Sequence, residues 1–104
     1  MERITLEFPA AQPARGRALC GVVGSGDLEV LLEPGAAGLT TVSITTSVQG
    51  MRRVWEAVLA RILGAAPLPA TNIEINDFGA TPGVVRMRIE QAFEELNAGE
   101  GTTR

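Results

Sequence analysis

The sequence has no histidine, no lysine and no tyrosine, and its single cysteine is Cys20. Without histidine, a serine or cysteine nucleophile lacks the base that most often activates it. Without lysine, the chain can form no Schiff base and has no P-loop lysine. One cysteine excludes an internal disulfide and a zinc site of the Cys/His type. These absences predict no catalytic residue and no metal site, and they favour a part of a larger assembly over an enzyme.

Charge and hydropathy exclude two further kinds of partner. The nine arginines face twelve acidic residues, which gives a net charge of −3, and they occur singly or in pairs rather than in a basic patch. This distribution argues against a nucleic-acid partner. No apolar run reaches the length of a signal-peptide core or a membrane span. Together with a free thiol at Cys20, these features predict a cytoplasmic protein with no membrane partner.

The length predicts one domain. A chain of 104 residues can bury a hydrophobic core without disulfides or metals. The last residues, NAGEGTTR, are small and polar. We therefore expect a single domain over residues 1–97 and a flexible C-terminal tail over residues 98–104.

Alternation of apolar and polar residues predicts the strands. One more strand, without a clear alternation, is expected in the apolar stretch 18–23. The strand over residues 41–47 has one face of Thr and Ser hydroxyls. The alternating apolar residues are Ile4, Leu6 and Phe8; Leu28, Val30 and Leu32; Val42, Ile44 and Val48; and Ile73 and Ile75.

Two segments change to the helical period. The first is predicted over residues 51–64, with an apolar stripe of Met51, Val54, Trp55, Val58, Leu59 and Ile62. The second is predicted from Pro82 to about Asn97, with Thr81 as its N-cap and a stripe of Val85, Ile89, Ala92, Phe93 and Leu96. The order strand-strand-strand-strand-helix-strand-helix predicts an α+β fold, in which two helices pack on one face of a mostly antiparallel sheet of four to five strands.

The segment GVVGSGDLEVLL predicts a hairpin whose register depends on the loop length. A loop of two or four residues places Leu19, Gly21 and Val23 on the core face with Leu28, Val30 and Leu32. A loop of three residues places Ala18, Cys20 and Val22 there instead, because a shift of one residue turns every side chain over. We favour the first register, since Leu and Val fill a core better than Ala and Cys.

Ser25 lies at or beside the tip of this hairpin, between Gly24 and Gly26. Gly-Ser-Gly is ordinary turn chemistry, and that is the simpler interpretation. The alternative is a modification site, because flanking glycines let a transferase approach the hydroxyl. Asp27 either hydrogen-bonds the turn backbone or helps the modifying enzyme to recognise the loop.

Two long segments carry a family resemblance. ARGRALCGVVGSGDLEVLLEPG and INDFGATPGVVRMRIEQAFEEL resemble, in this order, the acyl carrier (delta) subunits of malonate decarboxylase. The resemblance runs from LEFPA near the start through EQAFEEL and makes residues 1–97 an acyl carrier domain. The acyl carrier of citrate lyase is a related alternative, and a non-carrier assembly subunit is another.

The resemblance implies a function for Ser25, which occupies the serine position of the family's SGDLEVL motif. It implies a covalent 2'-(5''-phosphoribosyl)-3'-dephospho-CoA group, attached through a phosphodiester and carrying acetyl or malonyl thioesters. The implied partners are a prosthetic-group transferase, a malonyl transferase subunit and carboxylase-like decarboxylase subunits. Gly24, Gly26 and Asp27 are then possible recognition residues of the loop, and the chain itself is not an enzyme.

Four other features have plain structural interpretations. Asp77-Phe78-Gly79 is predicted to form a strand-to-helix turn with Phe78 packed inward, although a docking role is an alternative. Trp55 is expected to fill the core between helix and sheet. Arg52 and Arg53 are expected at a solvated helix start, or alternatively to attract the anionic arm or an acidic partner. Glu94 and Glu95 are expected on a solvated helix face.

Overall fold

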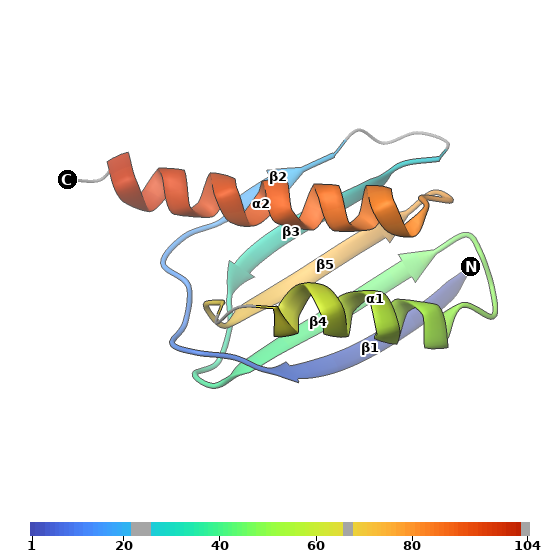
Figure 1. Cartoon of the computed structure of the whole chain (residues 1–104), viewed down its shortest axis with the longest axis horizontal. Helices are drawn as coiled ribbons and strands as arrows, with labels where there is room; N and C mark the ends of the chain where they lie inside the picture. Colours follow the sequence, from blue (N-terminus) through green and yellow to red (C-terminus); the bar gives the residue numbers. More distant parts are fainter. Residues whose placement is uncertain (22–25, 66–67, 103–104) are drawn as a thin grey trace.

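The computed structural model describes residues 1–21, 26–65 and 68–102, and the side chains of residues 97–102 are not described. Its two layers are a five-stranded sheet and two helices that both lie over one face of the sheet (Figure 1). The elements are β1 (Glu2–Pro9), β2 (Ala18–Cys20), β3 (Leu28–Pro34), β4 (Leu39–Thr46), α1 (Arg52–Gly64), β5 (Thr71–Asp77) and α2 (Pro82–Thr102).

The strand order across the sheet is β1-β4-β5-β3-β2. The β4–β5 pair is parallel and is joined through α1, whereas the other three pairs are antiparallel. The predicted α+β class, with a mostly antiparallel sheet and two helices on one face, is confirmed. The last strand in the chain, β5, is the central strand of the sheet. Its end therefore lies between the start of β3 and the end of β4, both of which are distant from it in sequence.

The faces of β1, β4 and β5 follow the predicted alternation. Ile4 and Leu6 of β1 are buried, as are Ile73 and Ile75 of β5. In β4, Val42 and Ile44 point into the core while Ser43 is exposed on the opposite face. The strand ends at Thr46, however, so the prediction that Val48 belongs to its buried face is wrong, and Val48 is 41% exposed.

Helix α1 begins at Arg52 and buries a narrower stripe than its sequence predicts. Trp55 is only 6% exposed and packs in the core with Leu59 and Ile62, as expected. Met51 precedes the helix, and Val54 is exposed although both were expected in the stripe. The stripe is narrower because Met51 and Val54 line an open cleft with residues of α2 instead of packing against the sheet.

Helix α2 begins as predicted. The Val84 amide donates to Thr81 Oγ1 at 3.3 Å, so Thr81 caps the helix, and Pro82 is its first residue. The whole predicted stripe is buried: Val85, Ile89, Ala92, Phe93 and Leu96. The helix continues to Thr102, beyond the end expected near Asn97. The flexibility of residues 98–104 stays a prediction.

The favoured register of β2 against β3 is wrong. Ala18 pairs with Leu32 and Cys20 with Val30, so these small residues lie on the core face, whereas Leu19 is 58% exposed. Val22 and Val23 lie outside the described residues. Small side chains are needed at 18 and 20 because α2 lies over β2 and β3 (Figure 1), and its Phe93 and Leu96 fill the same core cluster.

Candidate functional site

The segment singled out in the sequence is described only at its two ends. Ser25 and Gly24 lie outside the described residues, whereas Gly21 precedes the segment and Gly26 and Asp27 follow it. Gly21 lies close to the backbone of β3, and Gly26 and Asp27 are held by hydrogen bonds. The site is therefore built here from the residues that frame Ser25.

Position 21 requires glycine for two reasons, which are its backbone φ and the closeness of strand β3. Its φ is +119°, and a Cβ at this position would collide with the Leu28 carbonyl oxygen and lie 2.9 Å from Glu29 Cα. L side chains rarely adopt such a φ, and here the space is filled by backbone as well. Only glycine therefore allows the chain to leave β2 so close to the start of β3.

Gly26 and Asp27 are joined to the turn that follows β5. The Gly26 amide donates to the Phe78 carbonyl at 2.7 Å, and the Phe78 amide donates to the Asp27 carbonyl at 2.9 Å. The bond from Phe78 to Asp27 extends the β3–β5 register beyond the Leu28–Asp77 pair, but Gly26 also bonds to Phe78. Two residues thus face Phe78, as in a β-bulge with glycine at a positive φ. Gly26 and Asp27 are thus direct neighbours of Phe78 in the DFGATPG segment, about 50 residues further along the chain.

Asp77 builds the turn on the other side of Phe78. Its carboxylate is buried and accepts hydrogen bonds from Thr46 Oγ1 at 2.8 Å and from the Ala80 amide at 2.9 Å. The first bond ties the end of β5 to the end of β4, and the second closes the turn. The turn between β5 and α2 is as expected, whereas Phe78, which was expected to pack inward, is only half-buried and lies outside the cluster of buried core residues.

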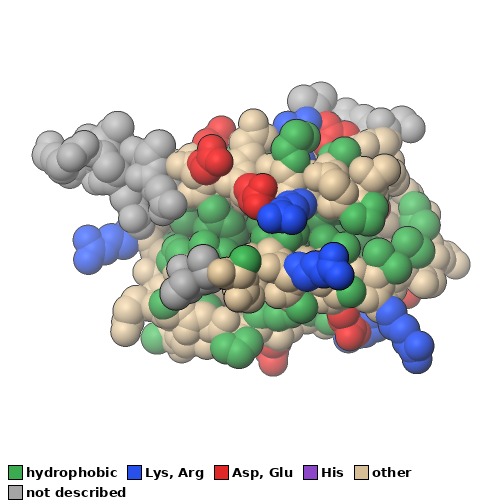
Figure 2. Space-filling view, in the orientation of Figure 1, with side chains coloured by type: hydrophobic (Ala, Val, Ile, Leu, Met, Phe, Trp, Pro, Cys, Tyr) green, Lys and Arg blue, Asp and Glu red, His purple; other side chains and the backbone are tan. Residues whose placement is uncertain are grey.

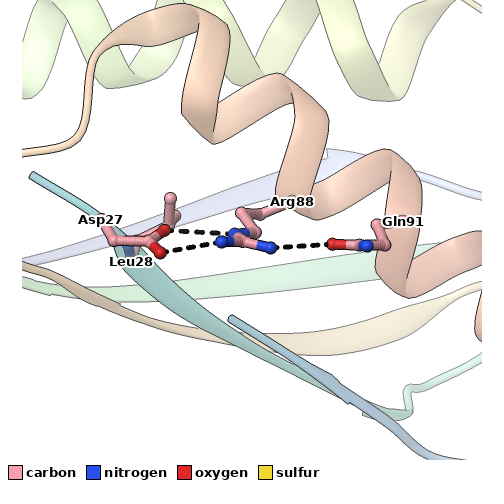
Figure 3. Close-up of polar contacts among 4 residues, drawn as sticks. All are labelled: Asp27, Leu28, Arg88 and Gln91. Carbon is pink, nitrogen blue, oxygen red and sulfur yellow. Dashed lines mark hydrogen bonds and ion pairs between the residues drawn. The ribbon is translucent and has the colours of Figure 1, made fainter. Parts of the chain in front are cut away.

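Asp27 is also bound by Arg88 of α2 (Figure 3). Arg88 Nε donates to Asp27 Oδ1 at 3.1 Å and Arg88 Nη2 donates to Oδ2 at 2.8 Å, while each side chain is 20% exposed. Oδ1 also accepts from the Leu28 amide at 2.7 Å, and Arg88 Nη1 donates to Gln91 Oε1 at 3.1 Å. Bidentate Arg–carboxylate pairs of this kind fix geometry as well as charge.

The pair changes the titration of Arg88. Hydrogen bonds to the Asp27 carboxylate raise the pKa of Arg88, burial opposes this change, and the negative charge of Asp27 adds to it. Arg88 therefore stays a cation at every pH at which the protein is studied. The expectation that Asp27 bonds to turn backbone is confirmed by its bond with Leu28, although the ion pair was not foreseen.

Sequence reasoning missed Arg88, although a weak signal was present. Arg88 follows the buried Val85 by three positions and precedes the buried Ala92 by four, so it borders the apolar stripe of α2. A charged residue at the edge of a buried stripe indicates a partner on the neighbouring element. The sequence does not say which acidic residue that partner is.

Cys20 is close to this site but is not reactive. Burial raises the pKa of its thiol to about 11, with further contributions from a hydrogen bond to Glu95 and from the negative charge of Glu95, while Arg88 opposes the change. Cysteine reacts as the thiolate. The chain's own thiol is therefore unsuited to carry an acyl group.

The remaining charged candidates are on the surface. Arg52 Nε pairs with Glu56 at 3.2 Å and Arg52 Nη2 donates to the Thr5 carbonyl at 3.3 Å, while Arg53 is exposed. Glu94 and Glu95 are exposed, as expected. Among the residues that the structure describes, no group of acidic or cysteine side chains suits a metal ion, and no helix is long and apolar enough to cross a membrane.

An apolar cleft of about 220 Å³ opens between α1 and α2, beside the same turn. Its lining includes Trp55 in its floor, the half-exposed Met51 and Val54, and Gly79. The glycine lies close to the framed segment, since a Cβ on Gly79 would be 4.0 Å from the Gly26 nitrogen. Figure 2 shows hydrophobic side chains reaching the surface between the two helices. This face therefore exposes apolar surface next to the residues that frame Ser25.

Comparisons with known proteins find relatives over most of the chain. Residues 15–96 match the family model described as "Malonate decarboxylase delta subunit (MdcD)". The chain is 61% identical over 95 residues to the malonate decarboxylase acyl carrier protein of Pseudomonas paraeruginosa, covering 91% of this chain and 96% of that one. It is 58% identical over 96 residues to that of Pseudomonas fluorescens (strain Pf0-1), covering 92% and 97%.

A solved structure shares the fold. It is the crystal structure of a Pseudomonas malonate decarboxylase hetero-tetramer in complex with malonate. One of its chains matches with a TM-score of 0.89 and 56% sequence identity, covering 92% of this chain and 99% of that chain. At this identity and coverage, the likeness extends over the whole fold.

Proposed function

The chain belongs to the malonate decarboxylase delta subunit family, and is thus an acyl carrier subunit rather than a catalytic one; on this basis we propose that Ser25 is its attachment residue. The observation that carries the proposal is the family match over residues 15–96, which includes the SGDLEVL motif around Ser25. The prosthetic group that we propose is 2'-(5''-phosphoribosyl)-3'-dephospho-CoA. It is the group that the sequence resemblance implies.

The residues framing Ser25 suit a bulky attached group. Gly26 has no side chain, and nothing lies within 4 Å of the position that a Cβ would take there. Its amide is already bonded to Phe78, and the adjacent Asp27 is held by Arg88. The residue directly after the proposed attachment site thus has open space beside its Cα and a backbone held by a hydrogen bond.

Attachment requires little of the chain itself. The Ser25 hydroxyl oxygen forms a bond to the α-phosphorus of a triphosphoribosyl donor, the bond from that phosphorus to the pyrophosphate leaving group breaks, and the serine proton passes to a base of the transferase. The carrier has no histidine or lysine to serve as that base. When bound, the group supplies a terminal thiol that holds acyl groups as thioesters.

The proposed partners follow from the same family. We infer that the carrier presents its acyl group to a malonyl transferase subunit and to carboxylase-like decarboxylase subunits, after loading by a prosthetic-group transferase. The structural relative is part of a malonate decarboxylase hetero-tetramer, which supports an assembly of several subunits. A covalent arm raises the local concentration of the acyl group at each active site. A cytoplasmic location belongs to this proposal.

Intact-mass measurement tests the attachment residue. The chain is produced with its own maturation enzymes as wild type, as Ser25→Ala and as the control Ser43→Ala, because Ser43 is an exposed serine on the far side of β4. We expect wild type and Ser43→Ala to gain the mass of one group and Ser25→Ala to gain none. Modification of Ser25→Ala, or none of the wild type, would refute the assignment.

A count of thiols provides a second readout. Cys20 is the chain's only cysteine and is buried, so the unmodified native protein is expected to show no rapidly reacting thiol. The loaded protein should show one, contributed by the arm. A loaded protein whose reactive thiol disappears on Cys20→Ala would contradict the proposal.

A further inference from the structure

Arg88 connects Asp27, two residues after Ser25, to helix α2. It lies on α2, 61 residues from Asp27, and its two bonds to the carboxylate are 3.1 and 2.8 Å long. A guanidinium that makes two parallel bonds fixes both the position and the plane of the carboxylate. Gln91 in turn accepts a bond from Arg88, which fixes the guanidinium (Figure 3).

Asp27 is held by different parts of the fold through its backbone and through its side chain. Asp27 is bonded through its carbonyl to Phe78 and through Oδ1 to the Leu28 amide, so its backbone is held on β5 while its carboxylate is held on α2. Gly26 is bonded to Phe78 as well. The backbones of Gly26 and Asp27 are thus both bonded to Phe78, and Arg88 bonds the Asp27 side chain to α2.

Arg88 also compensates a charge. The Asp27 carboxylate is two residues from Ser25, and the donor that we propose for Ser25 carries several phosphates. Like charges close together repel, and the repulsion is strongest where solvent screens little. Arg88 places a cation 2.8 Å from that carboxylate, and this cation is permanent.

We infer that Arg88 is a positioning residue for the modification of Ser25: through Asp27 it fixes the segment that follows the serine and neutralises the charge that the donor meets. The inference rests on the proposed function of Ser25. It assigns Arg88 no contact with the donor and no part in proton transfer. It concerns a residue that neither the family name nor the Ser25 motif identifies.

The test is the kinetics of loading by the prosthetic-group transferase, followed by intact mass at varied donor concentration. Arg88→Gln is expected to lower kcat/KM at least tenfold, with a higher KM for the donor and a lower kcat. Arg86→Gln is the matched control, because Arg86 is on the same helix, is exposed and pairs with Glu90 at 3.1 Å. It removes the same charge and should stay within twofold of wild type.

Two further variants separate charge from geometry. Arg88→Lys keeps the charge but not the two parallel bonds, so its KM should stay near the wild-type value while kcat falls. In Asp27→Asn/Arg88→Gln the carboxylate charge is also gone, so the KM should return toward wild type while kcat stays low. A purely structural role of Arg88 would give no such division between KM and kcat.

Folding is checked separately, by circular dichroism and urea unfolding of every variant at the assay temperature. If folded Arg88→Gln and Arg88→Lys both load at the wild-type rate, the inference is overturned and the assignment of Ser25 stands. An equal loss in Arg86→Gln would also overturn it, because the effect would then be one of net charge. A wild type that is never loaded would refute the proposed function first and the inference with it.

Discussion

Gly21 gives the sharpest structural prediction, because two independent costs meet at one residue. Replacement by alanine puts a Cβ on a backbone with φ +119° and drives it into the Leu28 carbonyl and Glu29 Cα. Backbone strain at a disfavoured φ costs on the order of 1–3 kcal/mol. A displaced strand in a packed core adds about 1–3 kcal/mol. The two costs sum to about 2–6 kcal/mol. We expect Gly21→Ala to lower the free energy of unfolding by an amount in the middle of this range, about 3–5 kcal/mol.

Two alanine variants calibrate this value. Gly38 has φ +81° with open space around it, so Gly38→Ala carries the backbone cost alone, about 1–2 kcal/mol. Gly64 is helical, has no positive φ and also has open space, so Gly64→Ala should stabilise the protein by about 0.5–1 kcal/mol. The difference between Gly21→Ala and Gly38→Ala is the part that comes from the collision.

The assay is urea unfolding of the unmodified chain, followed by tryptophan fluorescence of the buried Trp55. The three variants are compared with wild type at one temperature, with attention to whether the slope of the transition changes. A loss of 3–5 kcal/mol is a large fraction of the 5–15 kcal/mol typical of a small domain. If Gly21→Ala lowers the free energy of unfolding no more than Gly38→Ala does, residue 21 does not approach β3 as closely as the structure shows.

Three further predictions concern groups around the same core. Thr81→Ala removes the cap of α2 and should cost about 1 kcal/mol in the same unfolding assay, whereas no loss would mean that the bond to the Val84 amide is absent in solution. Asp77→Ala leaves Thr46 Oγ1 and the Ala80 amide without their carboxylate and should cost about 3 kcal/mol, and a loss below about 1 kcal/mol would contradict its role as the brace of the turn. Because burial raises the pKa of Cys20 from 9.0 to about 11, its alkylation at pH 8 should be at least about a hundredfold slower in the native than in the unfolded protein, and equal rates would refute this. The same shift means that the folded state holds the thiol proton more tightly, so stability should fall between pH 9 and 11 in wild type and fall less in Cys20→Ala.

The strands and helices could be predicted because their signals are local. The alternation of Ile4 and Leu6, or of Ile73 and Ile75, reports which face of one strand is buried, whatever that strand pairs with. The order β1-β4-β5-β3-β2 depends on pairing between distant segments, and nothing in one strand specifies its neighbour. The central place of β5 was therefore not available from the sequence.

The error at β2 has a definite cause. The preference for Leu19 over Ala18 and Cys20 assumed that the core takes the largest apolar side chains. On β2 the core space is filled instead from α2, by Phe93 and Leu96, and the strand supplies small residues. Packing conserves total volume between elements rather than the size of each residue, so a single strand read in isolation gives the wrong face.

The contacts of Gly26 and Asp27 could likewise be predicted from the sequence only in part. A bond from Asp27 to nearby backbone was expected because turn chemistry is local, and the bond from the Leu28 amide to Asp27 agrees. The bonds to Phe78 and Arg88 cross more than 50 residues of sequence and follow from where β5 and α2 lie. Such contacts are accessible only once the strand order is known.

The two aspartates of the chain brace one end of strands β3 and β5, next in sequence to the proposed attachment residue Ser25. Asp27 and Asp77 are the only aspartates, and both lie where β3 and β5 meet the turn into α2. Asp27 bonds this end of the strands to Arg88 of α2, and Asp77 bonds it to Thr46 of β4. A carrier without catalytic side chains contributes to loading only through the position of its hydroxyl, and position is supplied by rigid supports around it.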